Sequence, residues 1–126
     1  MNVSYLLKSH PKVTEHVQAI PTNAVCISAI TEGELQFGLA KRPEAKRLHL
    51  VVKEFLQRVD VLPWNKNVAK CYGKIRVTLE NEGIGIGLLD LLIASHALEQ
   101  GLILVTNDKA FRQITGLVVE DWTLSS

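Results

Sequence analysis

The sequence predicts an α/β fold, a three-layer α/β/α domain built on a mainly parallel sheet. Short apolar runs alternate with longer segments of helical periodicity, and strands separated by helices form βαβ units whose strands run parallel. With 126 residues, 47% of them hydrophobic, the chain is long enough for one domain with a core and too short for two. We therefore treat residues 1–126 as a single domain.

The first elements are short. Residues 3–7 and 13–20 have the spacing of helical pieces, separated by Ser9, His10 and Pro11. Because proline cannot continue a helix from the preceding turn, we expect two pieces and not one long helix.

The next elements form a strand–helix–helix–strand series. Val25–Ser28 is an apolar run with β-branched residues, which predicts a buried strand, and Thr31–Ala40 is expected to be a helix. Lys46–Arg58 carries apolar residues at helical spacing, and Val59–Leu62 is a second strand that ends before Pro63. The apolar stripe consists of Leu48, Val52, Phe55, Leu56 and Val59.

The second half of the chain continues the alternation. Gly83 and Gly101 follow helical patterns and are expected to end them, since glycine adopts the left-handed conformation of a helix C-terminus. The predicted elements are a helix over Lys66–Glu82, a loop over Gly83–Gly87, a helix over Asp90–Gln100, a strand over Leu102–Thr106, a short helix around Phe111 and a strand over Leu117–Val119.

Three carboxylates lie where an apolar run or the glycine-rich loop gives way to the next element: Glu34, Asp90 and Asp108. The carboxyl ends of parallel strands meet at one edge of a sheet, where open α/β folds bind ligands. Crowded carboxylates repel and raise one another's pKa unless a cation neutralises them. The sequence therefore predicts a divalent metal site, in an enzyme or a metal-binding module.

Each acid also has a structural explanation, which stays open at this point. Thr31 and Glu34 have the spacing of a capping box, in which both side chains satisfy free N–H groups at a helix start. Asp90 at a helix start is favoured by the helix dipole, and Asp108 fits an Asn-Asp turn.

Other motifs are weaker. The loop Gly83–Gly87 lacks the Lys-Ser or Lys-Thr pair of a phosphate-binding loop. Lys66, Lys70 and Lys74 recur on one helix face and could contact nucleic-acid phosphates, although a solvated helix face is the favoured explanation. His96, flanked by Ala and Ser in an apolar helix, is expected to be a packed side chain and not a catalytic base.

Charge and cysteine content exclude several classes of protein. The net charge is only +1, from 14 Lys and Arg against 13 Asp and Glu, so a nucleic-acid partner must be bound by a local patch. Cys26 and Cys71 have no spacing typical of zinc or of a disulfide framework. No segment has the length of a membrane span or the pattern of a signal peptide. We expect a cytoplasmic protein without membrane contact.

Two segments resemble the PIN-domain ribonucleases, specifically the VapC toxins of toxin–antitoxin pairs. CISAITEGELQFGLAK is similar to the family's acidic strand-to-helix turn and matches it at Glu34. GIGLLDLLIASHALEQGLILVTND is similar to its most characteristic stretch, with the acid at Asp90 and the strand end at Thr106, Asn107 and Asp108.

The resemblance implies a Mg²⁺- or Mn²⁺-dependent endoribonuclease with Asp90, Asp108 and Glu34 as its catalytic and metal-binding residues. Asp90 is the expected direct ligand, and Thr106 and Asn107 are expected to shape the site. The implied partners are a VapB-like antitoxin, an RNA substrate such as initiator tRNA, and a second copy of the chain in a homodimer.

The chain departs from the family at its start. VapC proteins usually begin with an apolar strand that ends in Asp-Thr-Asn, whose Asp is a metal ligand, whereas MNVSYLLK resembles the helix after that motif. We therefore expect the first strand and its Asp to be absent and the domain to be truncated at its N-terminus. The alternatives are a catalytically impaired PIN-like module that binds an antitoxin or RNA, and a receiver-type phosphoacceptor domain, which Lys109 fits poorly.

Overall fold

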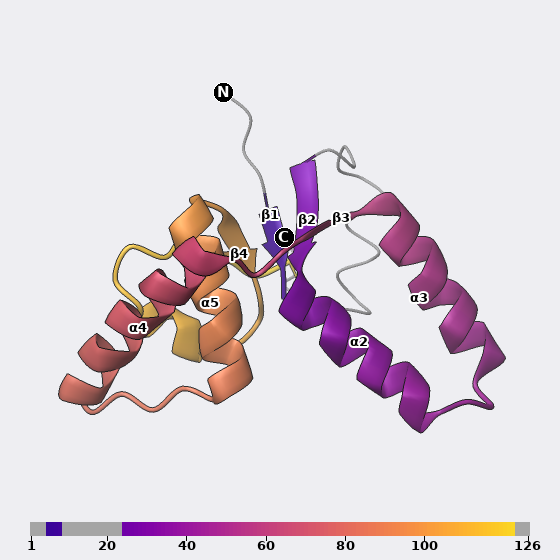
Figure 1. Ribbon diagram of the computed structural model, residues 1–126, viewed down its shortest axis with the longest axis horizontal. Helices are drawn as coiled ribbons and strands as arrows, with labels where there is room; N and C mark the ends of the chain where they lie inside the picture. The colour runs from indigo at the N-terminus through magenta and orange to yellow at the C-terminus, as the bar shows by residue number, and fades with distance from the viewer. Residues whose placement is uncertain (1–4, 9–23, 123–126) are drawn as a thin grey trace.

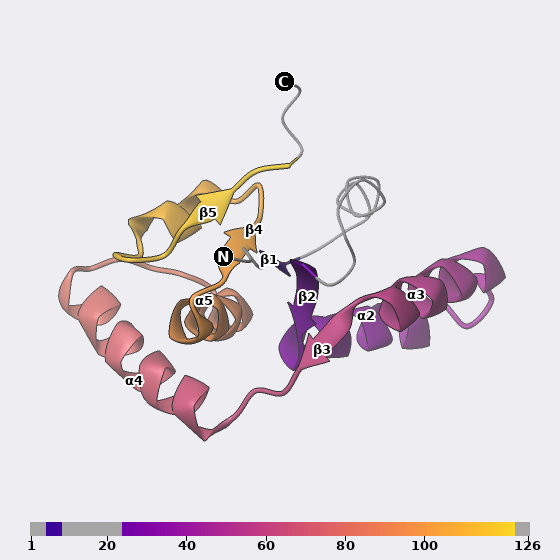
Figure 2. The same ribbon diagram turned by 90° about the horizontal axis from the view of Figure 1, so that it is seen from above.

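A five-stranded parallel sheet forms the centre of the molecule. The computed structural model describes residues 5–8 and 24–122. The strand order is β3-β2-β1-β4-β5, and every neighbouring pair is parallel (Figure 2). The strands are Tyr5–Leu7 (β1), Val25–Ser28 (β2), Asp60–Leu62 (β3), Ile103–Val105 (β4) and Val119–Glu120 (β5). The predicted parallel α/β fold is confirmed.

Strand β1 overturns two expectations from the sequence. Residues 3–7 were expected to be helical and the first strand to be absent, but Tyr5–Leu7 is the central strand and pairs with both β2 and β4. A run this short carries no decisive periodicity, and tertiary pairing decides its conformation. Leu6 and Leu7 are 0% and 1% exposed, so burial on both faces favours an extended segment over a helix.

Two N-terminal expectations remain without a test. The helix predicted over residues 13–20 lies outside the described residues. The expected truncation of the domain stays a prediction.

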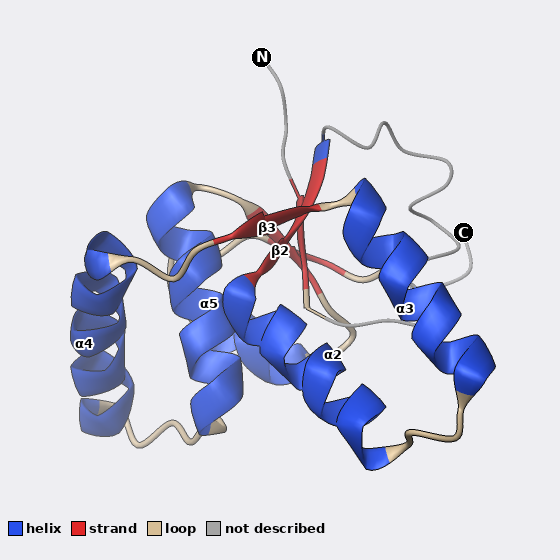
Figure 3. Cartoon of the chain, turned by 45° about the vertical axis from the view of Figure 1, so that its right-hand side comes forward, coloured by secondary structure: helices blue, strands red, loops and turns tan. Residues whose placement is uncertain are grey.

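Helices cover both faces of the sheet. They are Ala29–Lys41 (α2), Lys46–Arg58 (α3), Lys66–Asn81 (α4) and Leu88–Gln100 (α5), followed by the 3-10 helix Lys109–Gln113 (η2). Helices α4 and α5 lie together on one side of the sheet, and α2 and α3 lie on the other (Figures 1 and 3). The result is the predicted three-layer α/β/α arrangement.

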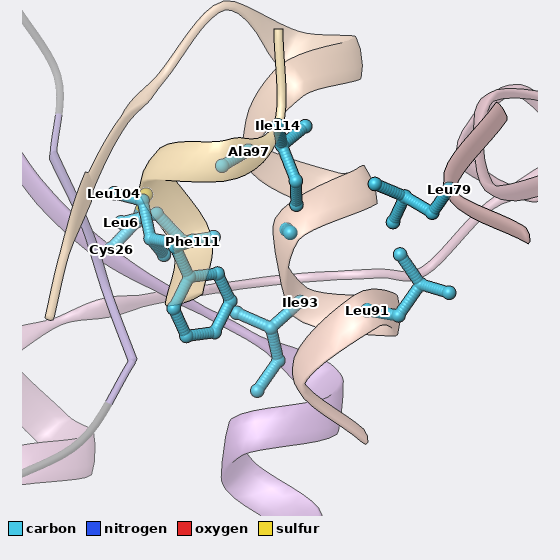
Figure 4. Packing of buried hydrophobic residues seen from close by; sticks show 10 residues of the cluster. Leu6, Cys26, Leu79, Leu91, Ile93, Ala97, Leu104, Phe111 and Ile114 are labelled. Atoms are coloured by element: carbon cyan, nitrogen blue, oxygen red, sulfur yellow. The ribbon is translucent and has the colours of Figure 1, made fainter. Parts of the chain in front are cut away.

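The core alternates along β1 as the pleat requires. Leu6 packs with Leu104, Ile93 and Phe111 in a cluster beneath α4, α5 and η2 (Figure 4). Its neighbour Leu7 points to the opposite face and joins the second cluster. That second cluster contains Leu7, Val25, Ile27, Phe55, Val59 and Val105. Because successive strand residues face opposite sides, a three-residue strand is enough to anchor both halves of the core.

Helix ends follow the sequence in one case and differ in another. Helix α5 ends at Gly101, whose φ of 66° is left-handed, as its glycine predicts. Helix α2 begins at Ala29 and not near Thr31, because the Ser28 side chain caps it by accepting from the Ile30 amide at 3.1 Å. None of the helices in residues 5–8 and 24–122 combines the length and apolarity needed to cross a membrane.

Candidate active site

The carboxyl end of β1 is the point where the order of the strands in the sheet reverses. From β1 the chain continues to β2 on one side, and it returns later to β4 on the other side. Ligands of open α/β sheets bind at such a switch point, beyond the carboxyl ends of the strands. Lys8 is the residue that follows β1 there.

Glu34 lies on helix α2 close to this point. Because Ser28 is the N-cap and the helix already starts at Ala29, the capping-box explanation of Glu34 is wrong. The other member of the expected box, Thr31, uses its hydroxyl to donate to the Lys8 carbonyl at 3.5 Å. Glu34 thus has no capping role at the helix start.

Asp90 lies in the first turn of α5 and contacts Lys8. The N-cap of α5 is Gly87, and no side chain caps this helix start. The Lys8 ammonium Nζ lies 3.4 Å from Asp90 Oδ1, and the two side chains are 20% and 30% exposed. Asp90 therefore acts as an ion-pair partner at the switch point, in addition to its favourable place at the helix dipole.

Glu34 and Asp90 belong to one electrostatic site. Partial burial raises the pKa of Glu34 above its ordinary value, Lys8 acts to lower it, and Asp90 acts to raise it further. Both the repulsion and the attraction require the three groups to be near one another. Of the three predicted acids, Asp90 thus contacts Lys8, and Glu34 lies within electrostatic reach of both.

Asp108 has a structural role that the sequence interpretation left open. Its Oδ1 accepts from the Ala110 amide at 2.9 Å and caps η2, while its own amide donates to Thr106 Oγ1 at 3.1 Å. Thr106 is buried and Asn107 is exposed. Among residues 5–8 and 24–122, no three His, Cys, Asp or Glu side chains group closely enough to hold one metal ion.

The donor set still suits one kind of cation site. Mg²⁺ keeps several waters and is commonly bound by one or two carboxylates together with substrate phosphates. Glu34 and Asp90 supply two such carboxylates. The two carboxylates can bind such a cation once the Lys8 ammonium has moved away from Asp90. A lysine ammonium and a divalent cation repel each other and cannot both contact Asp90 Oδ1 favourably.

Sequence reasoning missed Lys8. Its amide donates to the Val105 carbonyl at 3.1 Å, which continues the β1–β4 ladder by one residue. Its ammonium lies 5.4 Å from the centroid of the buried Phe111 ring, in the range of a cation–π contact. The available signal was its position directly after the apolar run Tyr5–Leu7, which was interpreted as helical.

A buried polar pair ties the two acid-bearing helices together. His96 Nδ1 of α5 and Ser28 Oγ, the cap of α2, are 2.8 Å apart. His96 is 0% exposed, its Nε2 has no hydrogen-bond partner among the described atoms, and burial lowers the pKa of its ring. Because α2 carries Glu34 and α5 carries Asp90, this pair fixes the relative placement of the two acids. The expected packed histidine is confirmed.

The basic face of α4 is solvent-exposed. Lys66, Lys70 and Lys74 are exposed, whereas Arg76 donates to Tyr72 Oη at 2.7 Å and to Glu80 Oε2 at 3.1 Å. Arg76 is therefore occupied within its own helix. The three lysines form an exposed basic stripe that fits both a solvated face and a phosphate contact.

Comparison with known proteins identifies the relatives of this arrangement. Residues 3–117 match the family described as PIN domain. Ribonuclease VapC2 of Rickettsia felis is 38% identical over 101 residues, covering 79% of this chain and 75% of the relative. The tRNA(fMet)-specific endonuclease VapC of Salmonella typhimurium is 35% identical over 119 residues, covering 94% of this chain and 90% of the relative.

Solved structures of related toxin–antitoxin complexes have a similar fold. DNA-bound VapBC from Salmonella typhimurium superposes with a TM-score of 0.84 at 34% identity, covering 95% of this chain and 98% of that one. VapBC2 from Rickettsia felis, bound to a DNA fragment from its promoter, gives 0.83 at 30% identity, with coverages of 95% and 99%. The receiver-type alternative is wrong, since both the family match and these folds point elsewhere.

Proposed function

This chain belongs to the PIN-domain family, and from that premise we propose that it is a metal-dependent endoribonuclease, the toxin of a toxin–antitoxin pair. The observation that carries the proposal is the contact of Asp90 with Lys8 at the carboxyl end of the central strand, with Glu34 within electrostatic reach of both. Relatives named ribonuclease or tRNA(fMet)-specific endonuclease, 35–38% identical, support the same activity. Initiator tRNA is accordingly the substrate we propose.

We assign Asp90 as the main ligand of a Mg²⁺ or Mn²⁺ ion and Glu34 as its partner. Such an ion supplies a Lewis acid that polarises a phosphate oxygen and lowers the pKa of a nearby water. Asp90 and Glu34 hold the compensating negative charge, and the Ser28–His96 contact keeps their helices in place. No side-chain nucleophile is required, and Ser95, whose hydroxyl donates to the Leu91 carbonyl at 2.7 Å, does not provide one.

Asp108, Thr106 and Asn107 have a shaping role in this proposal. Asp108 and Thr106 hold the turn after β4 through the two hydrogen bonds at its start. A metal-binding role of Asp108 requires its side chain to turn away from the Ala110 amide. We therefore assign Asp108 to the support of the site ahead of direct ligation.

The partners follow from the neighbours. Structures similar to this chain are VapBC toxin–antitoxin complexes, so we propose a VapB-like antitoxin as the inhibitor. We also propose that the toxin is a homodimer and acts in the cytoplasm, where tRNA is available.

A second candidate is favoured by one contact. The Lys8–Asp90 ion pair occupies the oxygen that a metal needs, so the fold could serve as a catalytically impaired module that binds an antitoxin or RNA. The two candidates differ in whether folded protein cuts RNA when a divalent cation is supplied.

The test compares cleavage and binding in one preparation. Purified protein is incubated with initiator tRNA and, as a matched control, an elongator tRNA, in Mn²⁺ or in chelator. If the chain is a nuclease, it should cleave the initiator tRNA in Mn²⁺ and not in chelator. Protein that is purified together with its antitoxin should cleave it much less. A folded, antitoxin-binding protein that leaves the tRNA intact in Mn²⁺ would refute it in favour of the binding module.

A further inference from the structure

We propose that Lys8 is a resident cation of the Glu34–Asp90 site, which a divalent metal ion must displace in order to bind. This inference rests on the proposed function and adds a regulating residue to its site. Lys8 thus competes with the metal ion for the carboxylates and takes no part in the chemical step.

Lys8 is held at the site by its backbone. Its amide donates to the Val105 carbonyl of β4, and its carbonyl accepts from the Thr31 hydroxyl of α2. These contacts join Lys8 to the elements on both sides of the switch point. The start of the side chain is therefore fixed, and only the flexible four-carbon stem is free to move the charge.

The ammonium makes two contacts from its one position in the structure. Nζ lies 3.4 Å from Asp90 Oδ1 and 5.4 Å from the centroid of Phe111. The aromatic ring belongs to Phe111 of η2, which is fully buried in the core cluster that α5 also lines. A partly buried cation that contacts both an acid and an aromatic ring is stabilised without a bound metal.

The charges explain why a competitor fits here. Glu34 and Asp90 carry the same charge, so they repel each other when no cation lies near them. Lys8 removes one of the two negative charges. Since divalent-cation affinity depends on the number of charged ligands, the ion pair weakens metal binding and its loss strengthens it.

The experiment measures Mn²⁺ binding directly, by titration calorimetry and by the Mn²⁺-dependent rise of the melting temperature, in the full chain. Lys8→Met keeps most of the stem and removes the charge. Lys8→Gln is a second uncharged variant in case the methionine variant folds poorly. Lys8→Arg retains the charge, and Lys70→Met removes the same net charge from the exposed face of α4.

We expect Lys8→Met to bind Mn²⁺ at least about tenfold more tightly than the wild type, which is about 1.4 kcal/mol. Lys8→Arg and Lys70→Met should stay near the wild-type affinity, and adding Asp90→Asn to Lys8→Met should abolish the gain.

Two results would overturn the inference in different ways. Binding that depends on Asp90 but is unchanged in both uncharged Lys8 variants refutes the competitor and leaves the proposed nuclease standing. Binding that is independent of Asp90 in every variant refutes the proposed metal site, and the competitor falls with it.

Discussion

Asp90→Asn separates a chemical role of this carboxylate from a structural one. The substitution keeps the size of the side chain and removes its charge. We expect metal-dependent cleavage of initiator tRNA to fall at least about 100-fold, because removal of groups that merely support metal ligands already costs 10–100-fold. A 100-fold loss corresponds to about 2.7 kcal/mol of activation free energy.

The cost to stability is smaller and can be worked from the structure. The ion pair with Lys8 is 3.4 Å long but joins side chains that are 20% and 30% exposed, so solvent screening limits it to roughly 0.2–1 kcal/mol. The loss of negative charge in the first turn of α5 adds about 0.3–1 kcal/mol. The total, about 1 kcal/mol, lowers the melting temperature of a domain of this size by roughly 3–5 °C.

The assay pairs tRNA cleavage in Mn²⁺ with thermal melting of the same sample. Asp60→Asn is the matched control, since Asp60 is exposed at the start of β3, on the opposite edge of the sheet. It should cut at the wild-type rate. A folded Asp90→Asn protein that cuts as fast as the wild type contradicts the assignment of Asp90.

Three further predictions follow from the neighbouring residues. Glu34→Gln should melt like the wild type, because Ser28 caps α2, yet it should cut RNA slowly and bind Mn²⁺ weakly. In the wild type, Mn²⁺ binding should be lost as the pH falls through the raised pKa of Glu34. Full activity of the Glu34→Gln variant would show that Glu34 has only a structural role. Ser28→Ala should lower the free energy of unfolding in urea by about 2–4 kcal/mol, since it removes the cap and leaves His96 Nδ1 without a partner; a loss below about 0.5 kcal/mol would contradict this. The pKa of the buried His96 is lowered, so the unfolded chain takes up the proton at a higher pH than the folded chain does. The contribution of neutral His96 to stability is therefore present above about pH 6.5 and is lost as the pH falls through the folded pKa, with a slope approaching 1.4 kcal/mol per pH unit. Urea unfolding of His96→Gln and of the wild type from pH 7.5 to 5 should show a shallower pH dependence of stability in the variant, and equal slopes would rule out this linkage.

The alternation of apolar runs and helical patterns was sufficient to predict the parallel sheet and most of its helices. Long segments such as Lys46–Arg58 and Lys66–Asn81 appear close to where their periodicity places them. Their apolar stripes can be buried in only one orientation, so local pattern and tertiary packing agree. The last strand is displaced, to Val119–Glu120 from the expected Leu117–Val119, because the ends of short elements depend on pairing and not on pattern.

The candidate site was predicted in part. Position after an apolar run or after the glycine-rich loop predicted Glu34, Asp90 and Asp108 as acids of one site, and Glu34 and Asp90 lie within electrostatic reach of each other. Sequence position could not distinguish these two acids from Asp108, whose carboxylate caps η2. Capping depends on where a helix starts within a residue or two, and that boundary is the least determined feature of a sequence.

The sequence by itself determined the layered parallel fold and the edge of the sheet at which its acids were predicted to lie, because burial of apolar faces and the direction of parallel strands leave few arrangements. Only the tertiary structure decided the conformation of Tyr5–Leu7 and the position of Lys8. Three apolar residues have no conformation of their own to enforce, and the hydrogen bonds offered by β2 and β4 made them the central strand. Their pairing carries the next residue, a lysine, to the carboxylate of Asp90.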